Sequence, residues 1–339
     1  MRIRGCLLHP IERPVGGVSR GLVRLLFDAH GVRAWARAVL YVLVFGLLLF
    51  GLSILVHAVL AAVPAWQRPL RAAFARAHAS SQMPPWLVSF QEALLLACAL
   101  AASAIMTELE GRPLRTIGLQ PGRRVCDLAS GFAVGFALLS VLVGALLVSG
   151  GARLFAPTQP VALVVRSGGA WLAAALLIGC AEEIAFRGYL FATLRETYGF
   201  WTAALAVTLA FGAAHGLNVG ENPTGLITAA LASLLFCLAI RRTGTLWWVI
   251  GMHAAWDWAE SYFYGSADSG MRSFGRLLTL QPQGGLYLSG GRDGPEGSFL
   301  CLIVLLAAIV ALPLLLPDRS LNRQVRGVSS FSAGDDARR

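Results

Sequence analysis

The amino-acid sequence predicts an all-α protein, a polytopic bundle of about eight transmembrane helices. Three observations support this prediction. Of the 339 residues, 56% are hydrophobic and only 14% are charged, and the mean hydropathy is +0.66. A soluble globular domain carries about 25% charged residues. The chain also contains repeated apolar runs of the length that an α-helix needs to cross a bilayer, and polar or turn-rich segments separate these runs.

Each predicted span is an apolar run of about 18 residues or more. In chain order the runs are 38–63, 86–106, 128–148, 170–194, 200–217, 223–240, 245–264 and 298–316. They divide the chain into a basic cytoplasmic arm (1–37), two N-terminal helices with a polar linker (38–125), a core of helices (126–264), a Gly-rich and flexible outer loop (265–297), a last helix (298–316) and a basic, disordered tail (317–339).

The basic residues report the orientation in the membrane rather than nucleic-acid binding. The net charge is +10, but the 28 basic residues are all arginines and lie mostly between or outside the apolar runs. Nineteen arginines fall in segments that are cytoplasmic if the N-terminus is inside, and eight fall on the other side. The positive-inside rule therefore predicts a multi-pass protein of the cell membrane with both termini in the cytoplasm.

Ionisable residues interrupt three of the predicted spans. The first group contains Glu182, Glu183 and Arg187, the second contains His215, and the third contains His253 and Asp257. A charge at the bilayer centre costs about 2.5–3.5 kcal/mol on insertion scales, so ionisable residues in spans usually serve a function. Single carboxylate and imidazole groups from several helices are also the usual way in which bundle cores form sites. These residues predict an intramembrane hydrolytic site.

Helical spacing assigns different positions to the two glutamates. Residues four apart share a helix face, whereas neighbours point about 100° apart. We therefore expect Glu183 to pair with Arg187 and Glu182 to face a cavity, which makes Glu182 the catalytic candidate. His253 and Asp257 also share a face, so the carboxylate can orient the imidazole. A buried ion-pair network that only fixes helix packing is the structural alternative for Glu182 and Glu183, and Glu92 is read as a lone packing residue.

Three motifs in this order resemble the CPBP family of intramembrane proteases, which includes the Rce1-type CAAX prenyl endopeptidases and the bacterial Abi proteins. The pattern EExxxR matches Glu182 to Arg187, FxxxH matches Phe211 to His215, and HxxxN/D matches His253 to Asp257. The resemblance covers about residues 170–264. The linker 112–119 weakly extends it. The chain departs from the prenyl endopeptidases at Asp257, where those enzymes commonly have Asn.

The resemblance implies an endopeptidase that hydrolyses a peptide bond near the membrane with an activated water. It implies that Glu182 is the general base assisted by Glu183, that His215 and His253 orient the water or stabilise the oxyanion, that Asp257 supports His253, and that Arg187 balances Glu183. It also implies access to the site from the cytoplasm. The metal requirement stays open, because Glu182, His215 and His253 form a possible catalytic zinc set, although the HExxH signature of zincins is absent.

Two other functions remain open at this stage. Intramembrane Glu, His and Arg residues also form ion relays, so an ion-coupled transporter is possible, although no two similar halves with broken helices are visible. A catalytically idle scaffold or bacteriocin-immunity protein is the second alternative. The expected partners are membrane lipid and a membrane-associated or lipidated peptide or protein. Nucleic acid is not expected, and the oligomeric state cannot be predicted.

Overall fold

The computed structural model describes residues 27–28, 31–80, 82–157, 159–218 and 220–318. The helices of these residues are α2 (Ala34–Ala62), α3 (Pro64–Ser80), α4 (Pro85–Leu109), η1 (Leu114–Ile117), α5 (Arg124–Val148), α6 (Val161–Glu183), η2 (Ile184–Gly188), α7 (Tyr189–Tyr198), α8 (Phe200–His215), α9 (Pro223–Thr243), α10 (Trp247–Trp258), η3 (Ala259–Tyr264), α11 (Leu286–Ser289), η4 (Pro295–Gly297) and α12 (Phe299–Leu315). The strands are β1 (Phe27–Asp28), β2 (Gly31–Val32), β3 (Gln82–Met83), β4 (Ala152–Phe155), β5 (Ala267–Asp268), β6 (Met271–Ser273) and β7 (Thr279–Pro282).

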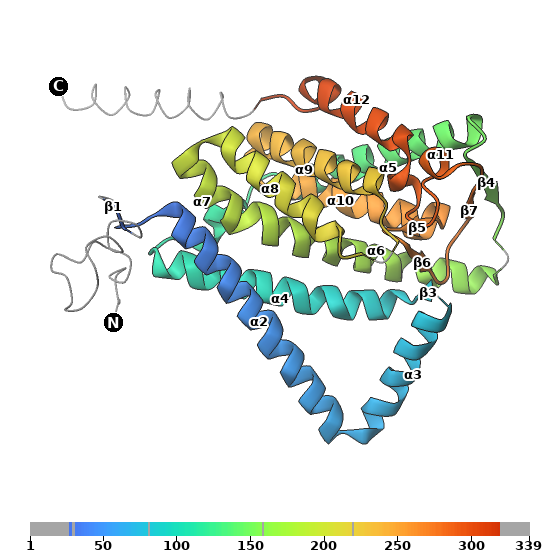
Figure 1. Cartoon of the computed structure of the whole chain (residues 1–339), viewed down its shortest axis with the longest axis horizontal. Helices are drawn as coiled ribbons and strands as arrows, with labels where there is room; N and C mark the ends of the chain where they lie inside the picture. The colour runs from blue at the N-terminus through green and yellow to red at the C-terminus, as the bar shows by residue number, and fades with distance from the viewer. Residues whose placement is uncertain (1–26, 29–30, 81, 158, 219, 319–339) are drawn as a thin grey trace.

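The chain is an all-α membrane bundle, as predicted (Figure 1). Five segments are long and apolar enough to cross a membrane by length and composition, namely α2, α4, α5, α9 and the continuous run from α6 through α7. The helices α8 and α12 are apolar but shorter. All eight predicted apolar runs are helical, and the main difference is α3, a helix in a segment that was predicted to be a connection. The protein is therefore a multi-pass membrane protein.

The centre of the bundle is α10, which packs against α5 and α6. Glycines allow the backbones of α5 and α10 to approach closely. A methyl group at Gly131 or Gly135 would collide with the carbonyl oxygens of Trp248 and Met252, and one at Gly251 would collide with that of Leu128. Small residues at helix contacts are typical of membrane bundles, where packing rather than water expulsion holds helices together. This contact fixes the position of the helix that carries His253.

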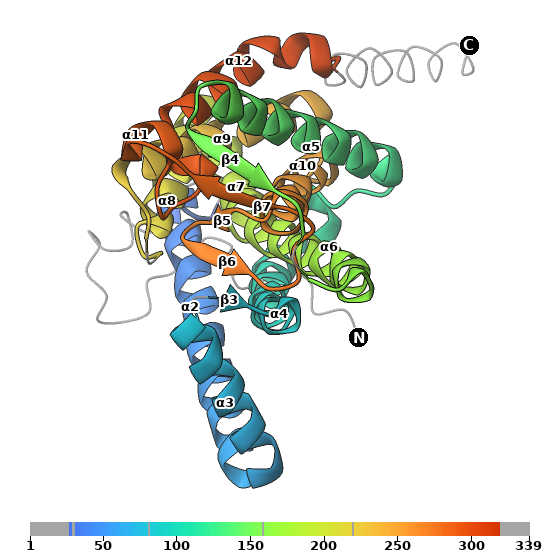
Figure 2. The ribbon, with the colours of Figure 1, turned by 90° about the vertical axis from the view of Figure 1, so that its right-hand side faces the viewer.

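The first two helices extend away from this centre (Figure 1). Only 6% of the most apolar window of α2 is buried inside the structure, and large apolar side chains such as Leu47 and Phe50 are exposed on it. The following helix, α3, returns to the bundle as a separate limb in both views (Figures 1 and 2). The exposed apolar surface of α2 is the surface expected of a helix in contact with lipid.

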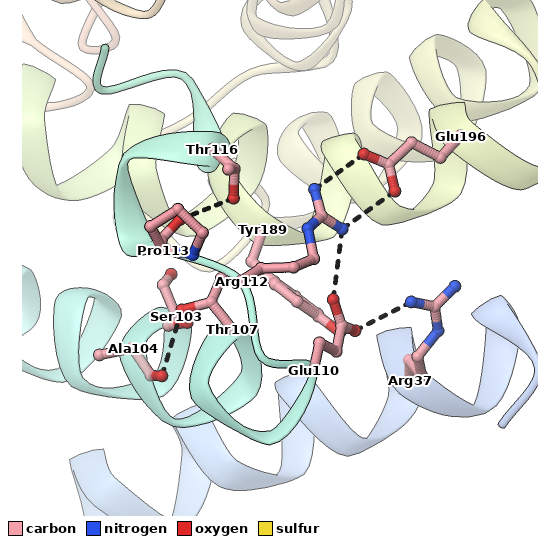
Figure 3. Close-up of polar contacts among 10 residues, drawn as sticks. All are labelled: Arg37, Ser103, Ala104, Thr107, Glu110, Arg112, Pro113, Thr116, Tyr189 and Glu196. Atoms are coloured by element: carbon pink, nitrogen blue, oxygen red, sulfur yellow. Dashed lines mark hydrogen bonds and ion pairs between the residues drawn. The ribbon is translucent and has the colours of Figure 1, made fainter. Parts of the chain in front are cut away.

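One end of the bundle, here called the arginine end, holds the C-termini of α4, α7 and α9 and the N-terminus of α5. A charged network joins three helices there (Figure 3). Glu110 accepts from Arg37 at 2.9 Å and from Arg112 at 3.2 Å, and Tyr189 donates a short hydrogen bond to it. Arg112 also forms a two-pronged pair with Glu196 at 3.0 and 2.8 Å. The network ties α2 to the core.

The opposite end, here called the loop end, carries the short strands β3 to β7 (Figure 2). The strand β3 pairs in parallel with β6, which pairs antiparallel with β5, and β4 pairs antiparallel with β7. The predicted flexible outer loop 265–297 is therefore folded: it contains three strands, α11 and η4, and its Asp293 is fully buried. The basic arm lies outside the described residues up to position 26, and the tail lies outside them from position 319.

Candidate active site

The three predicted motifs meet inside the bundle, from α6 and η2, from α8 and from α10. Both glutamates end α6, where the helix continues into a wide π-helical turn, η2, that carries Arg187. A second π-helical segment, η3, follows Asp257 on α10. Such wide turns are uncommon and occur frequently at functional sites, because they change the direction in which side chains leave the helix.

The predicted ion pair is present and is completely buried. Arg187 Nη1 lies 2.7 Å from Glu183 Oε1, and Glu183 is 0% and Arg187 1% exposed. The guanidinium carbon of Arg187 also lies 4.1 Å from the ring centre of Phe211 and 5.3 Å from that of Phe236. The aromatic faces stabilise the cation. Phe211 of the second motif therefore has a structural role, which is to cover the arginine.

Glu183 has a second partner that helical spacing did not predict. His253 Nδ1 lies 2.9 Å from the same Oε1 atom of Glu183. Because a carboxylate can only accept, Nδ1 carries the proton and donates it to Glu183. If the ring is neutral, Nε2 on its other side therefore carries no proton. The orientation of His253 is set by Glu183 of α6, rather than by Asp257 alone, and the ring also stacks on Phe236 at 5.5 Å.

Glu182 faces the cavity that lies beside this pair, as predicted. The cavity has a volume of about 390 Å³ and is lined by Glu182, His215, His253 and Asp257. The side chain of Glu182 is 25% exposed, in contrast to that of Glu183. His253 Nε2 lies 3.7 Å from Glu182 Oε2 and 3.7 Å from Asp257 Oδ2, and neither oxygen has a hydrogen-bond partner. Two polar atoms at this distance can share one bridging water.

His215 enters the same cavity from the end of α8. Its Nδ1 lies 3.0 Å from the carbonyl oxygen of Phe211 in the preceding turn, so Nδ1 donates there. The ring is also 4.4 Å from that of Phe211. The remaining nitrogen, Nε2, is not involved in this bond and is available on a residue that lines the cavity.

The cavity also contains Glu92 of α4, which the sequence did not assign to the site. Glu92 lines the cavity, and its Oε2 is buried without a hydrogen-bond partner. Glu92 is therefore not isolated from the three motifs, and its interpretation as a packing residue stays a prediction. The one available signal was its ionisable character within an apolar run, which by itself does not reveal which helix face meets the other motifs.

The cavity extends towards the loop end of the bundle. Its lining includes Asn218 after α8, Asp268 and Met271 of the short strands, and Glu296 of η4. Under the predicted orientation, with both termini and therefore the arginine end in the cytoplasm, this end of the cavity would lie on the outer side. Access from the cytoplasm stays a prediction.

The possible zinc set does not fit the observed arrangement. Within the described residues, the group whose ligand atoms come close enough to hold one ion is Glu260, Asp268 and Glu296, and not the set of Glu182, His215 and His253. His253 Nε2 and Glu182 Oε2, 3.7 Å apart, are close enough to share an ion, so it is His215 that does not converge with them. A catalytic zinc ion requires three protein ligands at about 2.0–2.2 Å. No step of the mechanism is therefore derived through zinc.

The comparisons with known proteins agree with this geometry. Residues 164–259 match the family model described as type II CAAX prenyl endopeptidase Rce1-like. The matched segment runs from α6 to the start of η3 and contains all three motifs. No curated protein and no solved structure gives a significant match. The match covers less than a third of the chain, and it supports a CPBP/CAAX protease family assignment and, in general, a CAAX-protease-like intramembrane endopeptidase.

Proposed function

We propose that the protein hydrolyses peptide bonds of membrane-associated substrates with a water activated by Glu182. The observation that carries this proposal is the convergence of Glu182 Oε2 and Asp257 Oδ2 on His253 Nε2, each at 3.7 Å, with both oxygens unpartnered in a cavity. A general base must lie within hydrogen-bond reach of the proton that it removes, directly or through one water. A water between Glu182 and His253 meets this condition.

In the proposed reaction, Glu182 removes a proton from this water while the oxygen attacks the substrate carbonyl carbon. The resulting oxyanion needs hydrogen-bond donors. His253 and His215 line the cavity, and each can donate from Nε2 when its imidazole has taken a second proton from solvent before the attack. Collapse of the tetrahedral intermediate breaks the C–N bond, and Glu182 returns its proton to the leaving amine. The atoms balance without a metal ion.

Glu183 and Arg187 act in this proposal as positioning residues. Glu183 Oε1 binds both His253 Nδ1 and Arg187 Nη1, at 2.9 and 2.7 Å. A carboxylate that holds Nδ1–H favours the protonated imidazole and fixes the ring orientation. Arg187 supplies the positive charge next to this buried carboxylate. This arrangement supports different roles for the two adjacent glutamates.

The position and the lining of the cavity support a proposal for the substrate class. Apolar residues such as Val88, Ile178 and Leu305 line it together with the polar groups. We propose a membrane-associated or lipidated peptide that enters from the loop end. With the arginine end in the cytoplasm, this entrance is on the outer side.

The orientation can be measured through Cys126, which is exposed at the arginine end, whereas the other described cysteines are buried or half-buried. A membrane-impermeant thiol reagent should label Cys126 only after cells are opened. A Cys126→Ser variant identifies the labelled residue. If intact cells are labelled, and Cys126→Ser abolishes this labelling, the arginine end lies outside the cell. The proposed entrance would then face the cytoplasm.

The activity is tested with purified protein and a library of membrane peptides, prenylated and unprenylated, with products detected by mass spectrometry. We expect cleavage by the wild type and by Glu108→Gln, a matched change of an exposed carboxylate at the arginine end, and no cleavage by Glu182→Gln. Glu182→Gln should melt at the wild-type temperature, because its side chain faces the cavity. Cleavage by Glu182→Gln would refute the role of this base.

A chelator tests the mechanism separately. Cleavage that disappears with chelator and returns only with Zn²⁺ would contradict a glutamate-activated water. Cleavage that persists would support it.

A further inference from the structure

A second group of ionisable residues lies beside the catalytic cavity, at the loop end. Three carboxylates converge there from separate elements: Glu260 from η3, Asp268 from β5 and Glu296 from η4. One oxygen atom of each lies within 4.8 Å of the others. Two further carboxylates, Glu221 and Asp293, are close enough to contribute to the local negative charge.

Glu260 is the member whose environment requires a ligand. It is 0% exposed, and neither of its carboxylate oxygens has a hydrogen-bond partner. A buried polar group without a partner costs about 1–3 kcal/mol, and more if it is charged. Its oxygen is directed at those of Asp268 and Glu296, which are themselves acceptors. Carboxylates cannot satisfy one another when all are ionised, so the group lacks a positive partner.

The surroundings do not supply this partner. Within the described residues, none of the ion pairs formed by arginine or histidine includes Glu260, Asp268 or Glu296. The other oxygen contacts come from neutral donors. Ser261 donates to Asp268 at 2.9 Å, and the indole of Trp256 donates to Glu296 at 2.8 Å. These bonds fix the orientation of the carboxylates but leave their charge unbalanced.

We propose that Glu260, Asp268 and Glu296 bind a divalent cation that prefers oxygen ligands. The site is expected to bind Ca²⁺ more tightly than Mg²⁺. Oxygen-only ligands select hard cations of this class. Ca²⁺ accepts variable geometry and six to eight oxygens, whereas Mg²⁺ requires near-ideal octahedral geometry. Three carboxylates from a helix end, a strand and a short turn suit the less demanding ion. This site is distinct from Glu182 and does not depend on proteolytic activity.

The charge balance of the neighbouring groups agrees with this proposal. Burial and then the charges of Asp268 and Asp293 raise the pKa of Glu296 to about 8. Burial and then the charge of Asp293 raise the pKa of Glu221 to about 7. Without a cation, the carboxylates therefore resist ionisation at neutral pH. A bound divalent ion removes this resistance, because an adjacent positive charge favours the ionised form.

The site has a consequence for the catalytic cavity. Asp268 and Glu296 also line that cavity, and Glu260 follows Asp257 on the same continuous helix. A cation held by the three carboxylates would join η3, β5 and η4 and fix the wall of the cavity at the loop end. Binding should therefore stabilise the folded protein by mass action.

Terbium luminescence tests binding directly, with the full-length protein in detergent. Tb³⁺ replaces Ca²⁺ at oxygen sites, and Trp256 beside Glu296 is positioned to transfer its excitation to the ion. We expect Tb³⁺ emission on tryptophan excitation, displaced by Ca²⁺, in the wild type and in Glu108→Gln. Glu260→Gln and Asp268→Asn should lose most of it. Equal, displaceable emission from these two variants, or wild-type emission that Ca²⁺ and Mg²⁺ do not displace, would overturn the proposal.

Thermal unfolding distinguishes loss of the site from loss of the fold. In chelator, Glu260→Gln should melt near the wild-type temperature, because the change replaces a buried carboxyl group without a hydrogen-bond partner by an amide of the same shape. Added Ca²⁺ should raise the Tm of the wild type and of Glu108→Gln by several degrees and leave that of Glu260→Gln unchanged. A wild-type Tm that responds to neither Ca²⁺ nor Mg²⁺, or a variant that responds as the wild type does, would refute the site.

Discussion

The buried pair of Glu183 and Arg187 gives the prediction with the largest energetic effect. Both side chains are 0% exposed, and their atoms lie 2.7 Å apart. Arg187→Met removes the charge and keeps much of the apolar chain against Phe211 and Phe236. It leaves the Glu183 carboxylate buried with His253 as its remaining partner. Breaking a buried pair by removing one partner costs about 3–5 kcal/mol.

Glu183→Gln breaks the pair from the other side and should cost a similar amount, because the buried guanidinium then lacks its counter-charge. The double variant carries neither charge, so its cost should be well below the sum of the two single costs. The expected coupling energy is about 2–3 kcal/mol. Unfolding in mixed detergent micelles, followed by tryptophan fluorescence, measures all three variants.

The control is Glu196→Gln, which breaks the pair with Arg112 at the arginine end. The Glu196 side chain is 46% exposed. An exposed pair contributes about 0–1 kcal/mol, so this change should be small. If the cost of the double variant equals the sum of the costs of Glu183→Gln and Arg187→Met within about 0.5 kcal/mol, the two residues behave as independent sites. That result would refute the reasoning.

The remaining predictions concern packing, the arginine-end network and pH. Gly135→Ala should destabilise by about 1–3 kcal/mol because its methyl group would collide with the Met252 carbonyl, whereas Gly144→Ala, with open space around it, should not; thermal unfolding compares them. Glu110→Gln should lower the Tm, because it removes the charge that two arginines share. In chelator, the Tm should fall as the pH rises from about 5 to about 8. The folded protein holds the Glu296 proton up to a pKa of about 8, and the unfolded chain releases it near 4.5. A flat pH profile would contradict this assignment.

The sequence predicted the parts of the site that depend on a single helix. The spacing of four residues predicted the pair of Glu183 and Arg187 and the exposure of Glu182 to a cavity, because the helical repeat alone determines which side chains share a face. The same rule placed His253 near Asp257. The apolar runs likewise predicted the bundle, since the thickness of a bilayer sets the length of its helices.

The parts that depend on contacts between helices could not be predicted in this way. The bond from His253 to Glu183 requires the packing of α10 against α6, and Glu92 enters the cavity from α4. The carboxylates of Asp268 and Glu296 are 28 positions apart in a Gly-rich segment whose fold depends on short strand pairings. No periodicity in the sequence encodes such contacts.

The proposed catalytic and cation sites are connected through one helix. His253, Asp257 and Glu260 follow one another at intervals of four and three residues on α10 and η3. The position of His253 Nε2 therefore depends on both ends of this segment. At one end the close contact of Gly251 with α5 holds it, and at the other the carboxylates of η3, β5 and η4 surround it. Catalytic groups must be held to within about 0.5 Å. A cation that fixes the second end would thus act on the geometry of the water site without touching the substrate.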